Sequence, residues 1–212
     1  MLKLEFSIEE ALKFGWDKTK QYFWTFFGIL LVAGIIAVIL SVLSETAKDN
    51  PGPMLIIGVI NSLFQLFLSM GLIKITVNTA KGQAPDPFDF FGAAGRILHY
   101  LGAYVMYLLI VFSGTILLVV PGIIWAIQFL FFSYLVIDGM LGPVAALKKS
   151  SQMTRGIKMS LFLFGLICTL INFLGAVCFL IGLFFTIPAT SIAYAYVYLK
   201  LREQTEAVPQ EQ

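Results

Sequence analysis

Long apolar stretches without a charged residue restrict the fold of this chain more than any other feature. The first runs from Phe23 to Leu43, about 20 residues, which as a helix crosses the ~30 Å hydrocarbon core of a bilayer. It is longer than the apolar region of a secretory signal peptide, about 7–15 residues, and it begins behind an organised polar segment. We therefore interpret it as a retained membrane anchor.

Composition excludes a soluble globular domain. Of the 212 residues, 59% are hydrophobic and 12% are charged, whereas soluble domains average about 45–50% and about 25%. A soluble core of this size cannot bury so much apolar surface, so lipid must solvate much of it.

Further apolar stretches follow the first, separated by short polar or Pro- and Gly-containing segments. We predict transmembrane helices at residues 23–43, 54–80, 97–120, 123–137, 159–180 and 183–199. Turns are predicted at 45–53 and at Pro121-Gly122, and Pro188 should kink the last helix. The predicted fold class is an all-α polytopic membrane helical bundle of about six spans, a single domain over residues 1–202. Residues 203–212 are predicted to form a disordered cytoplasmic tail.

Polar, periodic stretches precede the first, third and fifth spans. Before the first, Ser7 and Glu10 have the spacing of a capping box. Apolar residues then recur with helical period, at Ile8, Ala11, Leu12, Gly15, Trp16, Thr19, Tyr22 and Phe23. Before the fifth, one face of residues 143–156 carries Pro143, Ala146, Leu147, Ser150, Met153, Thr154 and, just beyond, Ile157. Both patterns predict amphipathic helices at the membrane interface. Asp86 and Pro87 predict the cap and first position of a shorter helix before the third span.

Positive charge lies almost entirely on one side of the predicted bundle. Lys48 is the only one of the 14 Lys and Arg residues in a predicted outer turn. The others lie near the termini and the two long linkers, at Lys3, Lys13, Lys18, Lys20, Lys74, Lys81, Arg96, Lys148, Lys149, Arg155, Lys158, Lys200 and Arg202. The positive-inside rule therefore predicts that both termini and both linkers are cytoplasmic.

An internal repeat is indicated by two matching stretches. Ala11-Leu12-Lys13 with Thr19-Lys20 recurs as Ala146-Leu147-Lys148 with Thr154-Arg155, at the same spacing. The stretch 86–91 holds the equivalent place before the third span, without that signature. We predict three units, 7–80, 86–138 and 143–200, each an interfacial helix and two spans, related by an axis along the membrane normal. The alternative is that amphipathic helices simply look alike.

Part of the chain resembles a known family. The matching stretches are Pro121-Gly122-Ile123-Ile124, residues 132–138 (Phe-Ser-Tyr-Leu-Val-Ile-Asp), residues 142–150 (Gly-Pro-Val-Ala-Ala-Leu-Lys-Lys-Ser) and Thr154-Arg155-Gly156. They resemble the signature of uncharacterised bacterial six-helix membrane proteins, a set similar to the membrane domain attached to some glycerophosphodiester phosphodiesterases. The resemblance is best over about 119–160 and implies this fold in the bacterial inner (plasma) membrane. It implies little chemistry, because the phosphodiesterase activity belongs to a separate soluble domain, for which this chain leaves no room.

Motifs for catalysis or for cofactor binding are absent from the sequence. His99 is the only histidine. We interpret it as an interfacial side chain, with axial ligation of a haem or chlorin as the alternative. A metal site normally needs several His, Cys or carboxylate groups close together, and neither a Gly-rich phosphate loop nor a Gly-x-Ser-x-Gly or His-Glu-x-x-His motif occurs. The sequence thus predicts a protein that is not an enzyme and holds no metal or cofactor.

Polar residues inside the predicted spans are more informative. Asn61 and Gln65 lie on one stripe of the second span, Gln128 in the fourth and Asn172 in the fifth. Intramembrane polar groups usually face the interior of a bundle. These four either line a polar pocket or form hydrogen bonds between helices, worth about 0.6 kcal/mol per contact on average. No carboxylate lies at mid-span, which argues against a proton-coupled pump.

A basic cluster lies between the fourth and fifth spans, at Lys148, Lys149, Arg155 and Lys158. It predicts contacts with anionic lipid headgroups, unless it reflects only the ordinary positive-inside bias. Nucleic-acid binding is not indicated, because the basic residues are few and adjoin membrane spans.

The leading functional hypothesis is a non-enzymatic scaffold or accessory subunit of a larger membrane complex, with the lipid bilayer and other membrane protein subunits as partners. It rests on the missing catalytic cluster, the missing ion-coupling charge and the short outer turns. The alternative is a transporter or lipid-handling protein with a polar pocket between spans two, four and five.

Overall fold

The computed structural model is all-helical over the residues that it describes, 4–178 and 181–207. The helices are α1 (Ile8–Gln21), α2 (Phe23–Thr46), α3 (Pro51–Ala80), α4 (Asp89–Ala94), α5 (Ile97–Leu117), α6 (Val119–Gln128), α7 (Phe132–Ile137), α8 (Pro143–Met153), α9 (Lys158–Val177) and α10 (Leu183–Glu206). The predicted all-α fold class is confirmed at this level.

Among the described residues, five helical stretches are long and apolar enough to cross a membrane. They are Phe23–Thr46, Pro51–Ala80, Ala94–Ile116, Val119–Ile137 and Lys158–Val177, and they follow the first five predicted spans in order. The predicted sixth span, α10, is not among these candidates in the described part of the chain. From Tyr194 onward it carries three tyrosines and Lys200, and most of these positions are buried or half-buried against the rest of the protein.

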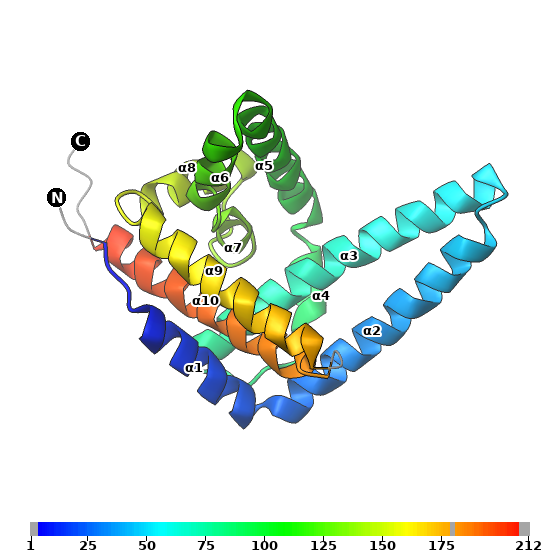
Figure 1. Cartoon of the computed structure of the whole chain (residues 1–212), viewed down its shortest axis with the longest axis horizontal. Coiled ribbons are helices and arrows are strands. Elements are labelled where there is room, and N and C mark those ends of the chain that lie inside the picture. Colours follow the sequence, from blue (N-terminus) through cyan, green and yellow to red (C-terminus); the bar gives the residue numbers. More distant parts are fainter. Residues whose placement is uncertain (1–3, 179–180, 208–212) are drawn as a thin grey trace.

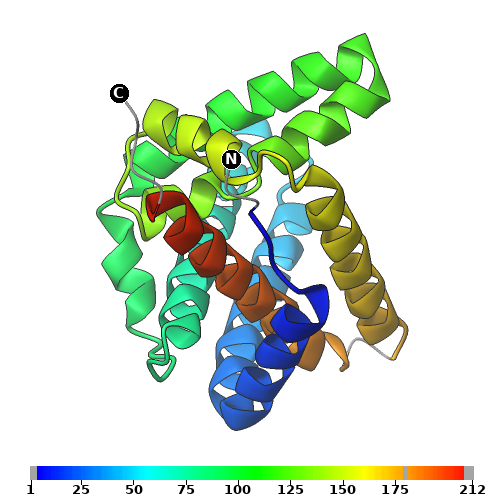
Figure 2. The same cartoon turned by 90° about the vertical axis from the view of Figure 1, so that its left-hand side faces the viewer.

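The long helices form three hairpins that spread away from a common region near the chain ends. In Figure 1 the hairpins α2–α3 and α5–α6 diverge, while α9 and α10 lie side by side below α5–α6. Figure 2 shows the green α5–α6 hairpin at the top and the α9–α10 hairpin pointing downwards. The arrangement is therefore more open than a parallel bundle of six helices.

The helix that precedes each hairpin packs against the last helical segment of the hairpin before it. Thus α4 packs against α3, α8 packs against α7 and also α5, and α1 packs against α10. Because the last of these contacts joins the two ends of the chain, the contacts close into a ring.

The first helix follows its sequence signals only in part. Ser7 caps α1 as predicted, because its Oγ accepts the N–H of Glu10 at 3.2 Å. The small residues of the predicted stripe, such as Gly15, are buried against α10, where a Cβ on Gly15 would lie 2.2 Å from the carbonyl oxygen of Ala189. The stripe therefore serves close packing of α1 against α10, while the charged face of α1 is exposed.

The helix α8 follows its sequence signals closely. It begins at Pro143, and its buried residues are Ala146, Leu147, Ser150 and Met153, which all belong to the predicted face. The face contacts α7 and α5.

Several predicted boundaries are wrong, and the prolines account for most of the differences. The chain does not turn at Pro121-Gly122: Leu118 is the extended residue between α5 and α6, and Pro121 lies in the first turn of α6. Pro51 likewise begins α3 instead of ending a turn. Proline is tolerated in the first turn of a helix, where its missing N–H has no partner to lose. Gly122 is needed for close packing, since a Cβ there would lie 2.3 Å from Thr115 Oγ1.

Two further differences concern helix lengths. The predicted fourth span is divided into α6 and α7, with a break between Gln128 and Phe132. The predicted tail began at residue 203, whereas α10 continues to Glu206; residues 208–212 of that tail lie outside the described residues. The short helix α4 starts at Asp89, and Asp86 caps the turn before it by accepting the N–H of Phe88 at 2.9 Å.

Candidate functional site

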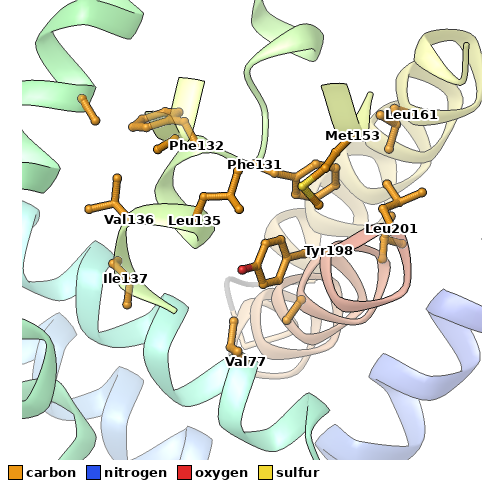
Figure 3. Close-up of a cluster of buried hydrophobic side chains, with 14 of the residues drawn as sticks. Val77, Phe131, Phe132, Leu135, Val136, Ile137, Met153, Leu161, Tyr198 and Leu201 are labelled. Atoms are coloured by element: carbon orange, nitrogen blue, oxygen red, sulfur yellow. The ribbon is translucent and has the colours of Figure 1, made fainter. Parts of the chain in front are cut away.

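The larger of two clusters of buried apolar side chains in the described residues lies where the three hairpins meet. Figure 3 shows Tyr198 of α10 surrounded by Phe131 and Leu135 from the α7 segment, Val77 of α3 and Met153 of α8. All five side chains are essentially inaccessible to solvent. This apolar cluster adjoins a group of charged side chains, and Tyr198 belongs to both.

Asp138 is the centre of these charges. It directly follows α7, and its side chain is 2% exposed. Lys81, at the end of α3, forms an ion pair with Asp138 Oδ1, and Arg202 Nη1 of α10 lies 2.8 Å from Oδ2. The hydroxyl of Tyr198 also donates to Oδ2, at 3.3 Å. One carboxylate thus joins the ends of all three hairpins; we call Lys81, Asp138, Tyr198 and Arg202 the charged hub.

The burial of the hub is one-sided. Asp138 is enclosed, whereas the side chains of Lys81 and Arg202 are 39% and 30% exposed. Charge pairing is stronger in surroundings of low dielectric constant, but the desolvation of the carboxylate offsets much of that gain. We therefore expect the hub to define how the hairpins are arranged, and to contribute stability mainly by keeping the buried carboxylate paired.

Further ion pairs attach α8 and α1 to α10. Glu206 accepts from Lys149 at 2.7 Å and from Arg202 at 3.0 Å, and Glu10 of α1 accepts from Lys200 at 2.8 Å. The hydrogen bond from Lys149 is the main reason why the pKa of Glu206 lies below its ordinary value. The hydrogen bond from Lys200 lowers the pKa of Glu10 in the same way. Both glutamates are therefore held in the charged form by the pairs that they make.

Gln128 joins the end of α6 to α8 and to the start of α9. Its side chain donates to Ser151 Oγ at 2.8 Å and accepts from Lys158 Nζ at 2.5 Å. Its backbone carbonyl, freed by the break after α6, accepts from Ser150 at 3.2 Å and from Thr154 at 3.0 Å. Irregular backbone within a membrane protein requires such replacement partners. The break is thus stabilised by α8.

The four predicted pocket residues do not converge. Asn172 of α9 donates to Thr190 Oγ1 of α10 at 3.1 Å, at a different helix contact from that of Gln128. Asn61 and Gln65 lie in the projecting half of α3 and have no hydrogen-bond partner among the described residues. None of the four lines the cleft between α2 and α3, which has a volume of about 530 Å³. The geometry therefore matches pairwise contacts better than a shared polar pocket.

The predicted lipid-binding cations divide into two pairs. Lys149 and Lys158 are engaged within the protein, with Glu206 and Gln128. Lys148 and Arg155 are exposed and have no ion-pair partner in the described part of the chain. Only this second pair is free to meet an anionic headgroup.

The remaining candidate, His99, lies exposed in the first turn of α5. Within the residues that the structure describes, no three His, Cys, Asp or Glu side chains are grouped so that they could hold a metal ion.

The hub itself was not predicted from the sequence. In the sequence, Lys81 and Arg202 served only to predict the orientation by the positive-inside rule. Asp138 served only to mark the end of the fourth predicted span. One signal was present: Asp138 is an acidic residue directly after the apolar run 132–137, on the side where the cations gather. An acidic residue at the end of an apolar run, on the side where cations gather, is a candidate for pairing with several of them.

No family model, no curated protein and no solved structure matches this chain. The family resemblance of residues 119–160 therefore stays a prediction.

Proposed function

We propose that this protein is a non-enzymatic scaffold or accessory subunit of a larger membrane complex. The observation that carries the proposal is the separation of Gln128 and Asn172, each of which bonds within a different contact between helices. Polar groups used in this way hold helices together and leave no convergent set for a substrate. A transporter or an intramembrane enzyme needs such a set.

The ring of helix contacts supports a three-unit repeat. In each proposed unit, a leading helix packs on the last segment of the preceding unit, α1 on α10, α4 on α3 and α8 on α7. Three units arranged about one axis would make these contacts equivalent. The hub then lies where the last helices of the units meet, which suits a platform with three arms.

The projecting hairpins, which we call arms, offer the surface for partner proteins. The hairpin α2–α3 projects from the hub region (Figure 1), and its exposed apolar residues include Val38, Leu55, Ile56 and Val59. The helix α3 has 30 residues and is therefore about 45 Å long, more than a ~30 Å hydrocarbon core requires. A long helical hairpin that its own chain leaves uncovered is suited to packing against helices of another subunit.

We place the hub on the cytoplasmic side of a bacterial inner membrane, with both termini there. The uneven distribution of Lys and Arg supports this orientation. Cysteines at Lys148 and Gln152 should resist a membrane-impermeant thiol reagent in intact spheroplasts, and a cysteine at Asp49 should react, with Cys168 and Cys178 changed to alanine. Labelling at Lys148 in sealed cells would overturn the orientation.

The scaffold role is tested by photo-crosslinking in native membranes. A photoreactive residue at Leu55 on the arm should yield a protein adduct of one defined mass, and the same partner should co-purify with the tagged chain in detergent-free lipid particles. The control is the same residue at Leu98, which is also well exposed but lies on α5, where we expect lipid adducts. A chain that purifies alone and gives only lipid adducts at Leu55 would contradict the proposal.

A further inference from the structure

An apolar cleft lies between the N-terminal part of α2, residues 24–36, and α3. Its volume is about 530 Å³, and its walls include Trp24, Gly28 and Val32 of α2, Phe64 and Phe67 of α3, and Phe90 of α4. We infer that this cleft binds one acyl chain of a membrane phospholipid. This inference goes beyond the scaffold role, which requires no bound lipid.

The lining of the cleft selects an apolar occupant. Thr25 provides its only side-chain hydroxyl, and aromatic and aliphatic groups make up nearly all of the rest. Apolar cavities of this kind do not hold water, because water there lacks polar partners. The volume falls within the range of about 300–1,000 Å³ that ligand pockets occupy.

A thin, flexible chain suits this cleft better than a helix from a partner protein, because a helix with its side chains is about 10 Å across. A methylene chain is one carbon wide and makes contacts at about 3.5–4.0 Å, so it can follow a narrow cleft along its length.

The cleft opens where acyl chains are concentrated. Its rim residues Trp24 and Val32 are 78% and 58% exposed, and both walls belong to helices apolar and long enough to span a membrane. Acyl chains of the surrounding bilayer therefore reach the rim directly.

The shape of the cleft is fixed by its walls. The ring of Phe90 occupies the space beside Gly71 of α3, where an added Cβ would lie 1.8 Å from Phe90 Cδ1. Asp89 holds this segment in place by accepting from Asn78 Nδ2 at 2.7 Å. On the opposite wall, a Cβ added to Gly28 would meet no atom within 4 Å. The fixed aromatic floor and the missing side chain at Gly28 together leave the cleft open.

The test uses a phosphatidylglycerol with a photoreactive diazirine on one acyl chain, added to the full-length protein in lipid nanodiscs. Crosslinked peptides are mapped by mass spectrometry. We expect saturable labelling at one lipid per chain, concentrated in residues 24–36 and 64–68, and competed by unlabelled phospholipid. Labelling that is no denser there than at the exposed residues 54–59 would overturn the inference, and so would competition only by a non-phospholipid apolar compound.

Matched variants test whether the cleft itself is the site. Gly28→Phe fills it and should reduce cleft labelling at least fivefold, whereas Gly34→Phe, at another α2 glycine whose added Cβ meets no atom within 4 Å, should leave it unchanged. A second pair, Val32→Trp at the rim and Val38→Trp outside it, covers the case that a glycine variant fails to fold. Labelling of residues 54–59 should stay constant in all variants. Equal cleft labelling within both pairs would overturn the inference.

Discussion

Two parts of α3 have different surroundings. None of residues 51–69 is fully buried, whereas the shorter second part, residues 70–80, buries seven: Met70, Gly71, Ile75, Thr76, Val77, Asn78 and Thr79. Polar and charged residues are fewer in proportion in the exposed part, the arm, than in the second part, which lies in the protein core. In a soluble helix the relation would be the reverse.

The physical reason lies in the solvent. Lipid tails are as apolar as a leucine side chain, so burying apolar surface between helices gives little driving force in a bilayer. Close packing and polar contacts must hold the core instead. In the second part of α3, Thr79 donates to its own helix at 2.8 Å and Asn78 bonds to Asp89 at 2.7 Å. In the arm, Asn61 and Gln65 lack partners among the described residues. Mutations in the two regions should therefore have different effects.

The largest effect is expected at the hub. Asp138→Asn removes the charge that pairs with Lys81 and Arg202. We expect a loss of about 3 kcal/mol in the free energy of unfolding, the lower end of the range for breaking a buried pair, because the two cations left behind can reach water. The measurement is SDS-induced unfolding in mixed micelles. Asp49→Asn, in the exposed turn of the arm, is the control and should change nothing. Equal losses in the free energy of unfolding for the two variants would show that the ion pairs of Asp138 do not stabilise the fold.

The next largest effect comes from adding one methyl group to a glycine in each region. Gly15→Ala places a Cβ 2.2 Å from Ala189 O, so α1 must move away from α10, at a cost of about 1–3 kcal/mol. Gly34→Ala on α2 meets no atom within 4 Å and should stabilise the helix by about 0.5–1 kcal/mol. In thermal unfolding, we expect Gly15→Ala to lower the unfolding temperature and Gly34→Ala to raise it. Destabilisation by both substitutions would contradict the comparison.

Local patterns predicted the helices well, and α8 shows why. Its apolar residues recur every three or four positions and include Leu147 and Met153, so the helical period identifies the buried face directly. In α1 the small residues Ala11 and Gly15 fitted the same period, but a small residue on a helix face is compatible with lipid, water or another helix. The sequence therefore predicted that α1 is a helix but not that it packs along α10.

The hub lay beyond such patterns because its members are far apart in the chain. Asp138 is separated by 57 residues from Lys81 and by 64 from Arg202, so no local spacing relates them. The break after Gln128 was missed for a similar reason: the hydroxyls that satisfy it belong to Ser150 of α8 and to Thr154 directly after α8. Only the folded chain shows which polar groups replace lost backbone bonds.

Acid should weaken the attachment of α8 and α1 to α10, in a pH range set by the pKa values of Glu206 and Glu10. The pKa of each is below its ordinary value in the folded protein, so their contribution is fully present above the ordinary value of about 4.3. It is lost as the pH falls through the lower, folded-state pKa. We expect the unfolding temperature to fall between about pH 5 and pH 3, and Glu206→Gln to show a smaller fall. At neutral pH that variant should lose about 0.2–1 kcal/mol, because the pairs are partly exposed. An unchanged acid profile would contradict this role.

The smallest effects separate pairwise contacts from a substrate site. Asn172→Leu removes the bond to Thr190, and the average value for such contacts in membranes gives a loss of about 0.6 kcal/mol. Removal of Asn172 Oδ1, which is buried without a partner in the described part of the chain, offsets some of this loss. Gln65→Leu on the arm breaks no bond and replaces an exposed amide by an apolar group, so stability should stay level or rise.

This order, a small loss at Asn172 and none at Gln65, follows only if each residue acts alone. A substrate site would couple the two residues, because both would contact one ligand. A ligand would then raise the unfolding temperature of the wild type, and either substitution would abolish that shift. Thermal unfolding of both variants and of the double variant measures the coupling. Additive effects, to within about 0.5 kcal/mol, mean that the two side chains share no site. A coupling well above that value, together with a ligand-dependent shift, would place Asn172 and Gln65 in one site and reject the scaffold role.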